Sequence, residues 1–351
     1  MAATPTRPTV GQGLFVHEHG DDIYTAAKLE EFPLPPLGPK DVLVKMLAAP
    51  INPSDVLSIT GTYGDIPPRP FVLGFEGAGS IIEIGTEVTS VAVGDWVLPG
   101  KPKFGTWRTH GIVDESMVAK IDKRLGFKAA ATLTVNPSTA YLMLTDMVDL
   151  KPGDTVIQNG ANSAVGQMLI QIAAQMGIRT INVVRNRANL QDLVTKLQGF
   201  GADVVITDDD LKKRASDDKW GSEGLAKPKM AIDCVGGELG SEMVRHLPPG
   251  GTLVSYGSMT GQPLTVSPLP LIFKDITVKG FWLLTVFMKT GKSRLQEEVF
   301  PYIGKLAAEG KFKFPEVELF AIQDYKEALK RATAGFTNLK QLLVMDESLL
   351  K

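Results

Sequence analysis

Residues 159–167, NGANSAVGQ, place small residues between two apolar runs. The run before them, DTVIQ (154–158), has the length of a buried strand, and the run after them, MLIQIAAQMGI (168–178), has the length of a helix. A tight turn of small residues between a strand and a helix lets backbone N–H groups approach an anion, and the helix from Ala164 adds the positive end of its dipole. The stretch therefore predicts the pyrophosphate-binding turn of a dinucleotide-binding fold.

The spacing of this turn leaves an alternative open. Only Gly160 and Gly166 fall in it, so it is not a strict G-x-G-x-x-G sequence. A strand-to-helix connection with no ligand has the same composition. The residues that follow the helix are needed to choose between the two interpretations.

The two parts of the chain around this turn have different patterns. From about residue 135, apolar strands such as RTINVVR (179–185) alternate with helical segments, which predicts a parallel sheet. Before residue 130, short apolar runs such as DVLVKML (41–47) are separated by Gly and Pro, which predicts a barrel-like β lobe. The stretch 208–229 is charged and predicts a long loop, with a short helix near its start as the alternative, and KQLLVM (340–345) predicts a last strand.

Composition limits the classes of partner. The chain of 351 residues has 37 Lys and Arg against 39 Asp and Glu, and this balance gives no reason to expect nucleic acid or an anionic membrane surface. No uninterrupted apolar run reaches the length of about 18 residues that a membrane span needs. The single cysteine, Cys234, excludes disulfides and cysteine-rich metal sites and favours a reducing compartment.

The end of the strand after the turn helix carries charges that favour one cofactor. Sites that prefer NAD place Asp or Glu about 20 residues after the turn, where a carboxylate holds the ribose hydroxyls. Here the segment is VVRNR (183–187), and its arginines can form charge-assisted hydrogen bonds with a 2′-phosphate. We therefore expect NADPH, with Arg185, Asn186 and Arg187 at the phosphate; the alternative is that the arginines only cover an exposed strand end.

Taken together, these segments resemble the medium-chain dehydrogenase/reductase superfamily, and most closely its mitochondrial trans-2-enoyl-thioester reductases. The similarity also includes INPSDVLSITGTYG (51–64), TLTVNPSTAYLML (132–144), KGFWL (279–283) and the terminal KQLLVM. It implies an α/β protein with a GroES-like β-barrel catalytic lobe and a doubly wound Rossmann domain. The implied domains are residues 1–134 and 285–351 for the catalytic lobe, with an NADP(H)-binding domain at 135–284 inserted between its parts.

Zinc alcohol dehydrogenases belong to the same superfamily, and their metal needs thiolate and imidazole ligands. In GFEGAG (74–79), Phe75 stands where the histidine would be, and INPSD (51–55) contains no cysteine. These residues exclude a zinc-activated alcohol, and we expect no metal site. A different acid must supply the proton.

Tyr63 is the candidate acid. In the family, the tyrosine of the TYG segment is assigned the proton transfer to the α-carbon after hydride reaches the β-carbon. A phenol is protonated near neutral pH and can donate. By itself, a tyrosine in the loop GTYGDIPPRP (61–70) is more typical of a packing residue.

The resemblance implies further cofactor contacts. They are Asn136 at the nicotinamide, Asn162, Ser163, Ala164 and Val165 at the pyrophosphate, Tyr256, Gly257, Ser258 and Met259 at the adenosine half or the ribose, Phe281, Trp282 and Leu283 at the nicotinamide and the acyl site, and Lys340 at the cofactor. The structural alternatives are a helix cap for Asn136, a turn for 256–259 and core packing for 281–283. Ala164 and Ser258 replace glycines that are common in such reductases, which weakens the expected close approach of the backbone.

The resulting hypothesis is an enzyme that reduces enoyl thioesters with NADPH in fatty acid synthesis. The carrier is acyl-carrier protein or coenzyme A, and Lys289, Lys292 and Arg294 are candidates for contact with an acidic carrier. The resemblance also implies a homodimer in the mitochondrion, although the first ten residues are not typical of a transit peptide and the cytoplasm is the alternative. Two other functions remain open: a zinc-free quinone or alkenal oxidoreductase, and an NADPH-binding protein without turnover.

Overall fold

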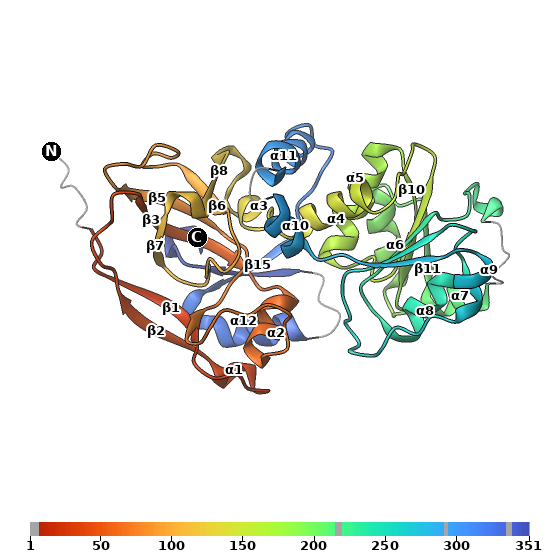
Figure 1. The fold of residues 1–351 in the computed structure, drawn as a ribbon, viewed down its shortest axis with the longest axis horizontal. Coiled ribbons are helices and arrows are strands. Elements are labelled where there is room, and N and C mark those ends of the chain that lie inside the picture. The colour runs from red at the N-terminus through yellow and green to blue at the C-terminus, as the bar shows by residue number, and fades with distance from the viewer. Residues whose placement is uncertain (1–6, 215–219, 291–293, 335–338, 351) are drawn as a thin grey trace. The chain divides into compact units, whose positions relative to one another are not determined.

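The computed structural model describes residues 7–214, 220–290, 294–334 and 339–350. The chain divides into two compact units (Figure 1). Unit 1 comprises Met1–Val135, Val286–Gly304 and Phe314–Lys351, and unit 2 comprises Asn136–Thr285 and Lys305–Lys313.

Unit 1 is built mainly on antiparallel strands, with one parallel pair, β15 and β16. Among its described residues, a seven-stranded sheet has the order β15-β16-β3-β5-β6-β8, with β7 paired to β3, and a smaller sheet has the order β2-β1-β4. The strands are β1 (Val10–Val16), β2 (Ala27–Pro33), β3 (Asp41–Pro50), β4 (Phe71–Val72), β5 (Ala78–Ile84), β6 (Trp96–Pro99), β7 (His110–Asp114), β8 (Val118–Ile121), β15 (Val317–Ala321) and β16 (Lys340–Val344). The helices are α1 (Ile23–Ala26), α2 (Pro53–Thr60), α3 (Phe127–Ala131) and α12 (Tyr325–Thr333), and α11 (Phe300–Ala308) begins here.

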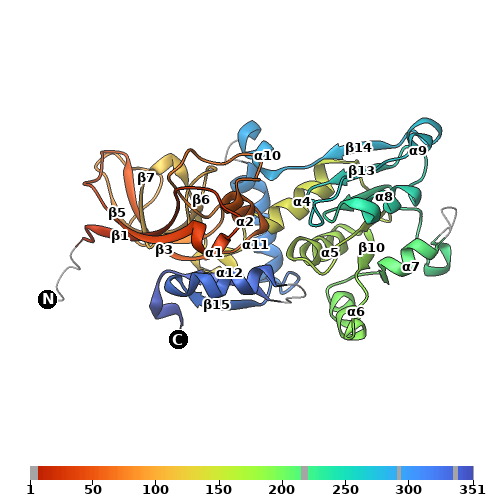
Figure 2. The same ribbon diagram turned by 90° about the horizontal axis from the view of Figure 1, so that it is seen from below.

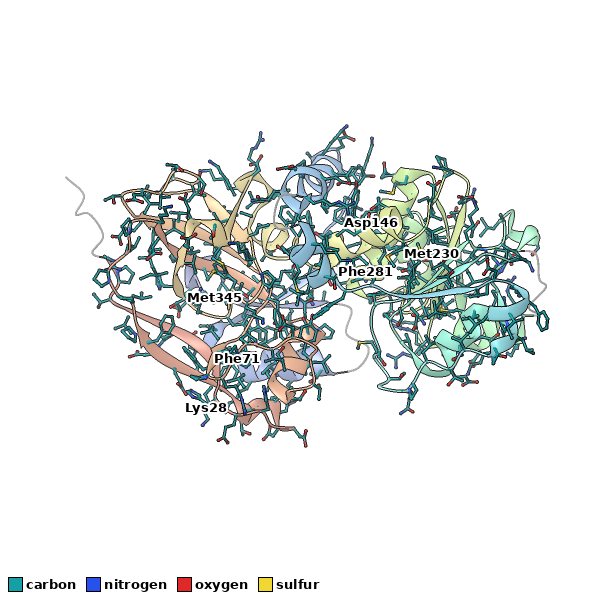
Figure 3. The ribbon with its side chains drawn as sticks, viewed as in Figure 1. Lys28, Phe71, Asp146, Met230, Phe281 and Met345 are labelled. Carbon is teal, nitrogen blue, oxygen red and sulfur yellow. The ribbon has the colours of Figure 1, made fainter. Side chains whose placement is uncertain are left out.

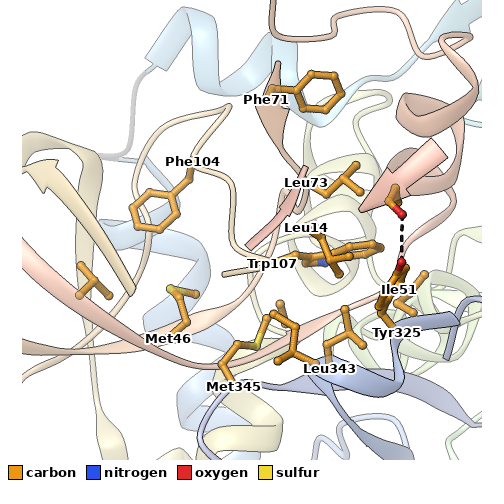
Figure 4. Packing of buried hydrophobic residues seen from close by; sticks show 14 of the residues in the cluster. Leu14, Met46, Ile51, Phe71, Leu73, Phe104, Trp107, Tyr325, Leu343 and Met345 are labelled. Carbon is orange, nitrogen blue, oxygen red and sulfur yellow. Dashed lines mark hydrogen bonds between the residues drawn. The ribbon is translucent and has the colours of Figure 1, made fainter. Parts of the chain in front are cut away.

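The core of unit 1 joins segments that are far apart in sequence. Trp107 is fully buried in it, and its indole N–H donates to the Pro50 carbonyl at 3.2 Å (Figure 4). The Tyr325 hydroxyl of α12 donates to the Ala27 carbonyl at 3.1 Å. Phe71 and Met345, labelled in Figure 3, belong to the same apolar cluster. The core of unit 1 therefore contains side chains from both the first and the last segments of the chain.

Unit 2 contains the predicted parallel sheet. Its strand order is β11-β10-β9-β12-β13-β14, and all the pairs are parallel. The strands are β9 (Thr155–Gln158), β10 (Arg179–Val184), β11 (Val204–Thr207), β12 (Met230–Asp233), β13 (Thr252–Ser255) and β14 (Thr277–Gly280). The helices are α4 (Asn136–Asp146), α5 (Ala164–Met176), α6 (Leu190–Gly199), α7 (Asp208–Lys213), α8 (Gly237–Arg245), α9 (Pro268–Phe273) and α10 (Leu283–Thr290), which continues into unit 1.

Helices cover both faces of this sheet, as Figure 2 shows. On one face, Ile181 and Val183 of β10 pack with side chains of α7 and α8. On the other, Val184 packs with side chains of α5 and α6. Because successive side chains of a strand point to opposite faces, the apolar run of β10 supplies both cores. The prediction of a doubly wound parallel sheet is confirmed.

Local sequence explains where the elements begin and end. The Ser163 hydroxyl caps α5 by accepting from the Gly166 N–H at 3.1 Å, and Gly177 ends this helix in a left-handed conformation. A capping box between Thr207 and Asp210 starts α7 inside the stretch predicted as a loop. The alternative of a short helix there is thus the one observed.

The chain passes from unit 1 to unit 2 after Val135 and returns after Thr285, and residues 305–313 also belong to unit 2. The backbone of Lys313 is bonded within unit 2, because its N–H donates to Gln171 Oε1 at 2.7 Å and its carbonyl accepts from Gln171 Nε2 at 3.1 Å. In the part of the chain that the structure describes, no helix is both long and apolar enough to span a bilayer.

Candidate active site

The predicted cofactor residues of unit 2 lie at the carboxyl end of its parallel sheet. Segments 159–165, 185–187, 256–259 and 281–283 directly follow β9, β10, β13 and β14. Because all these strands are parallel, their carboxyl ends share one edge, which is where open α/β sheets bind ligands. Residues spread over more than a hundred positions thus meet at one edge.

The glycines of the turn are required by close packing. Gly160 has φ +56°, and a Cβ there would lie 2.5 Å from the Cys234 sulfur. A Cβ on Gly166 would lie 2.7 Å from the Ala161 carbonyl oxygen, so only glycine lets the first turn of α5 approach the loop. Asn162 to Val165 remain partly exposed. The N-terminus of α5 therefore presents backbone N–H groups at the sheet edge, which fits an anionic group.

The turn after β9 is held by a buried carboxylate at the end of β12, the neighbouring strand in the sheet. Asp233, at the end of β12, accepts from Asn159 Nδ2 at 2.6 Å and from the N–H groups of Val235 and Gly236 at 3.1 and 2.9 Å. Asn159 in turn accepts from the Cys234 N–H at 2.9 Å. These bonds join the loops after β9 and β12. Asp233 and Asn159 are not among the site residues predicted from the sequence.

Tyr256 connects the predicted YGSM segment with the turn. Its hydroxyl is hydrogen-bonded to Ser163 and to Cys234. Burial, with the neighbouring Cys234, raises the pKa of Tyr256, and burial raises the pKa of the Cys234 thiol to about 11. Both groups are therefore neutral at physiological pH. The Met259 N–H donates to the Cys234 carbonyl at 3.0 Å and closes the loop.

Arg185 and Arg187 stand together after β10. Arg187 Nε donates to the Arg185 carbonyl at 3.4 Å. Burial and the charge of Arg185 both lower the pKa of Arg187. The two positive charges repel each other, and an anion bound near them would relieve the repulsion. Their chemistry fits a phosphate group, and Asn186 between them is exposed.

The remaining cofactor candidates of unit 2 differ in burial. Phe281 and Leu283 are buried after β14, while Trp282 is partly exposed (Figure 3). Asn136 is buried as the first residue of α4. Asn136 therefore lies at a helix start and not at one of the strand ends.

In unit 1, Tyr63 follows helix α2 and is held at its backbone and its ring. Gly61 ends the helix with φ +78°, and the Tyr63 N–H donates to the Leu57 carbonyl at 3.1 Å. The Tyr63 ring packs against Phe75, with centroids 5.4 Å apart. Phe75 is the residue expected from the sequence to replace the zinc-binding histidine of related dehydrogenases.

Lys340 belongs to a buried polar cluster in the same unit. Its ammonium donates to Asn52 Oδ1 at 2.6 Å, and Asn52 Nδ2 donates to Glu76 Oε2 at 2.9 Å. The other Glu76 oxygen accepts from the Val135 N–H at 2.6 Å. Asp55 has no exposed surface and accepts from the Asn52 N–H at 2.8 Å.

Burial controls the ionisation of this cluster. It raises the pKa of Asp55 to about 7 and also raises the pKa of Glu76, against the opposing effects of hydrogen bonds and the charge of Lys340. Burial lowers the pKa of Lys340, while the two carboxyl groups oppose that change. Asn52, Asp55 and Glu76 are not among the site residues predicted from the sequence. The sequence signal that could have identified them is the presence of carboxyl groups, Asp55 and Glu76, inside the segments INPSD and GFEGAG.

The structure describes two of the three residues expected to contact an acidic carrier. Lys289 is exposed at the end of α10, Arg294 forms an ion pair with Glu298 at 3.0 Å, and Lys292 lies outside the described residues. Across residues 7–214, 220–290, 294–334 and 339–350, no group of three or more His, Cys, Asp or Glu side chains could hold a metal ion.

Comparisons with known proteins identify the family. The alcohol dehydrogenase GroES-like domain matches residues 38–132, and the zinc-binding dehydrogenase domain matches residues 164–299. The mitochondrial enoyl-acyl-carrier-protein reductase of Rattus norvegicus is 42% identical over 340 residues, which cover 97% of this chain and 90% of the rat protein. The chain belongs to the enoyl-acyl-carrier-protein reductase family.

Solved structures agree with the family. Etr1p of the mitochondrial 2-enoyl thioester reductase heterodimer from Candida tropicalis has a TM-score of 0.87 and 31% identity, and the match covers 95% of this chain and 99% of that one. Etr1p in complex with NADP and crotonyl-CoA matches equally well. A putative NADPH:quinone reductase from Bacillus thuringiensis has a TM-score of 0.85 and 26% identity, with 96% and 99% covered. The predicted combination of a GroES-like lobe and a Rossmann domain is confirmed.

Proposed function

We propose that this family member reduces trans-2-enoyl thioesters to saturated acyl thioesters with NADPH. Its relatives are named as enoyl-acyl-carrier-protein reductases, and a similar protein binds NADP and crotonyl-CoA. In this proposal unit 2 is the NADP(H)-binding domain and unit 1 is the catalytic lobe.

One observation in the structure carries the proposal. The residue in the position of the zinc ligand is Phe75, and its ring packs against Tyr63. An aromatic ring cannot ligate zinc, but it supports the phenol that the proposed reaction needs as an acid. The lobe thus has the side chains for proton donation in the place where a zinc dehydrogenase activates an alcohol.

The chemistry needs one hydride and one proton. Bound NADPH supplies the hydride to the β-carbon of the enoyl thioester. A C–H bond forms there, and the electron pair of the double bond moves toward the α-carbon and the thioester carbonyl. Tyr63 then gives its hydroxyl proton to the α-carbon as a general acid and recovers a proton from solvent.

The residues of unit 2 hold the cofactor. The N–H groups of residues 162–165 bind the pyrophosphate, and Arg185, Asn186 and Arg187 bind the 2′-phosphate. Residues 256–259 contact the adenosine half, and Asn136 with residues 281–283 contacts the nicotinamide. The apolar segment FWLLTVFM (281–288) favours a fatty acyl chain as substrate.

The partners and the compartment follow from the relatives. We propose acyl-carrier protein as a physiological carrier of the substrate and the mitochondrion as the site of action. We also propose a homodimer, because β14 is the last strand of its sheet among the described residues and all four of its residues are exposed. The neighbouring α9 exposes Leu269, Ile272 and Phe273, whose exposed fractions are 61%, 69% and 77%.

A substrate panel tests the function. NADPH oxidation is measured with crotonyl-CoA, longer trans-2-enoyl thioesters, quinones and alcohols, and the products are identified. We expect saturated thioesters and no reaction of alcohols. Turnover of quinones alone would instead assign a quinone reductase, and NADPH binding without turnover of any compound would assign a binding protein.

A further inference from the structure

Asp55 is buried in the first turn of helix α2, and the other end of this helix leads to Tyr63. Its carboxyl group accepts two backbone hydrogen bonds, one from the Asn52 N–H at 2.8 Å and one from the Phe75 N–H at 3.2 Å. The first bond is local and forms the capping box of α2. The second bond reaches a residue 20 positions away, in the loop before β5.

These hydrogen bonds belong to a closed series of contacts that includes Tyr63. The Phe75 backbone is bonded to Asp55, and the Phe75 ring packs against the Tyr63 ring. The Tyr63 backbone N–H is bonded to the Leu57 carbonyl of α2, two residues after Asp55. Two series of contacts, one through Phe75 and one through α2, therefore connect Asp55 with Tyr63.

Backbone and ring contacts both place the Tyr63 side chain. Gly61 ends α2 in a left-handed conformation that turns the chain toward Tyr63. The Phe75 ring packs against the Tyr63 ring, and the Phe75 N–H is held by the Asp55 carboxyl group. A general acid must be placed accurately, because a displacement of about 1 Å can cost about 10²-fold in rate.

We propose that Asp55 is a positioning residue for Tyr63, acting through the Phe75 backbone and helix α2. This inference rests on the proposed role of Tyr63 as the proton donor. It assigns to Asp55 a role in the reaction that differs from capping a helix, although Asp55 does not touch the reacting atoms.

A double-mutant cycle tests the proposal with the full-length protein. In Asp55→Asn the side chain keeps its size but has a single oxygen, so one of the two backbone N–H groups loses its acceptor. We expect kcat with crotonyl-CoA to fall roughly 10- to 100-fold. In the Tyr63→Phe background the same substitution should cause no further loss, because the proton donor that it positions is already absent.

A second variant and a control complete the experiment. Phe75→Leu keeps an apolar side chain but removes the aromatic ring. We expect it to lower kcat, and this loss should also vanish in the Tyr63→Phe background. This variant replaces Asp55→Asn in the cycle if Asp55→Asn does not fold. Asp41→Asn is the control, because Asp41 also accepts from a backbone N–H, that of Gly38 at 2.8 Å, in the same unit. Its kcat should equal that of the wild type.

Two results would overturn the proposal. Equal fold-losses of Asp55→Asn in both backgrounds would show that Asp55 only stabilises the fold, and an unchanged kcat would show that it positions nothing. A wild-type kcat of Tyr63→Phe alone is a different result, since it would overturn the proposed acid and the inference with it.

Discussion

We expect Arg185 and Arg187 to select the cofactor from the end of one strand. They follow β10 directly, and the charge of Arg185 adds to burial in lowering the pKa of Arg187. The 2′-phosphate of NADPH would satisfy these charges, whereas the ribose hydroxyls of NADH offer no matching anion.

Replacing either arginine by alanine should therefore weaken NADPH selectively. A hydrogen bond to a charged group contributes about 1.5–3 kcal/mol, so the Kd for NADPH should rise roughly 10- to 100-fold while the Kd for NADH stays nearly constant. Fluorescence titration with both cofactors measures this. Arg179→Ala is the control, since Arg179 starts the same strand and pairs with Asp203 at 2.5 Å. Equal losses for both cofactors would mean that the arginines support the fold.

Tyr63→Phe should fold normally, since it keeps the ring that packs on Phe75. It should bind NADPH like the wild type but lose about 10²- to 10⁴-fold in the rate of enoyl reduction, because the general acid is removed. Steady-state kinetics with crotonyl-CoA measure the loss. Tyr24→Phe removes a hydroxyl elsewhere in unit 1 and should be fully active. Near wild-type kcat for Tyr63→Phe would rule out this acid.

The raised pKa of Asp55, about 7 because of burial, predicts a pH dependence of stability. Between its ordinary pKa and this value, the folded state binds the proton that the unfolded state has released. The contribution of Asp55 is thus present at low pH and is lost as pH rises through about 7, by on the order of a few kcal/mol. Glu76 changes in the same direction, and the opposing charge is that of Lys340.

Denaturation by urea at about pH 5 and about pH 8 tests this expectation. The wild type should lose more stability between these values than Asp55→Asn, whose amide does not titrate. The same change in both proteins would contradict the assignment.

At the scale of elements, the start of α5 depends on Gly166. A methyl group there would meet the Ala161 carbonyl oxygen at 2.7 Å and push the first helical turn away from the loop. That turn presents the N–H groups proposed for the pyrophosphate, which NADPH and NADH share.

Gly166→Ala should consequently weaken both cofactors by similar factors, in contrast to the arginine variants. The matched control is Gly199→Ala in α6, where a Cβ has no neighbour within 4 Å. Alanine there should stabilise the protein by roughly 0.5–1 kcal/mol and leave both Kd values unchanged. Thermal melts and titrations distinguish the two variants, and selective loss of NADPH in Gly166→Ala would argue against this role of the turn.

At the scale of the whole molecule, the exposed edge β14 and the apolar face of α9 predict an interface between two copies. Phe273→Glu places a charge at a side chain that is 77% exposed, so the subunit itself should remain stable. We expect the mass measured by light scattering to fall from dimer to monomer. Val93→Glu, at a side chain 61% exposed in unit 1, should remain a dimer. If the wild-type protein has the mass of a monomer, the prediction of a dimer is wrong.

Patterns over a few residues were sufficient to predict the main features of the fold. Alternating strands and helices from residue 135 predicted the parallel sheet, and the small residues of 159–167 predicted where α5 begins. The arginines of the VVRNR segment predicted NADPH as the cofactor. Each of these features depends on the backbone or on charges close together in sequence, so the physical cause is visible without the fold.

The tertiary structure alone decided which distant side chains meet. Lys340 and Asn52 are hydrogen-bonded across 288 positions, and the Asp55 carboxyl reaches the backbone of Phe75. No sequence period encodes such contacts. The first arises when β16 pairs with β3 and brings Lys340 beside the start of α2, and the second when β5 pairs with β3. The elevated pKa of Asp55 has the same origin, since desolvation depends on everything that surrounds a carboxyl group and not on its neighbours in the chain.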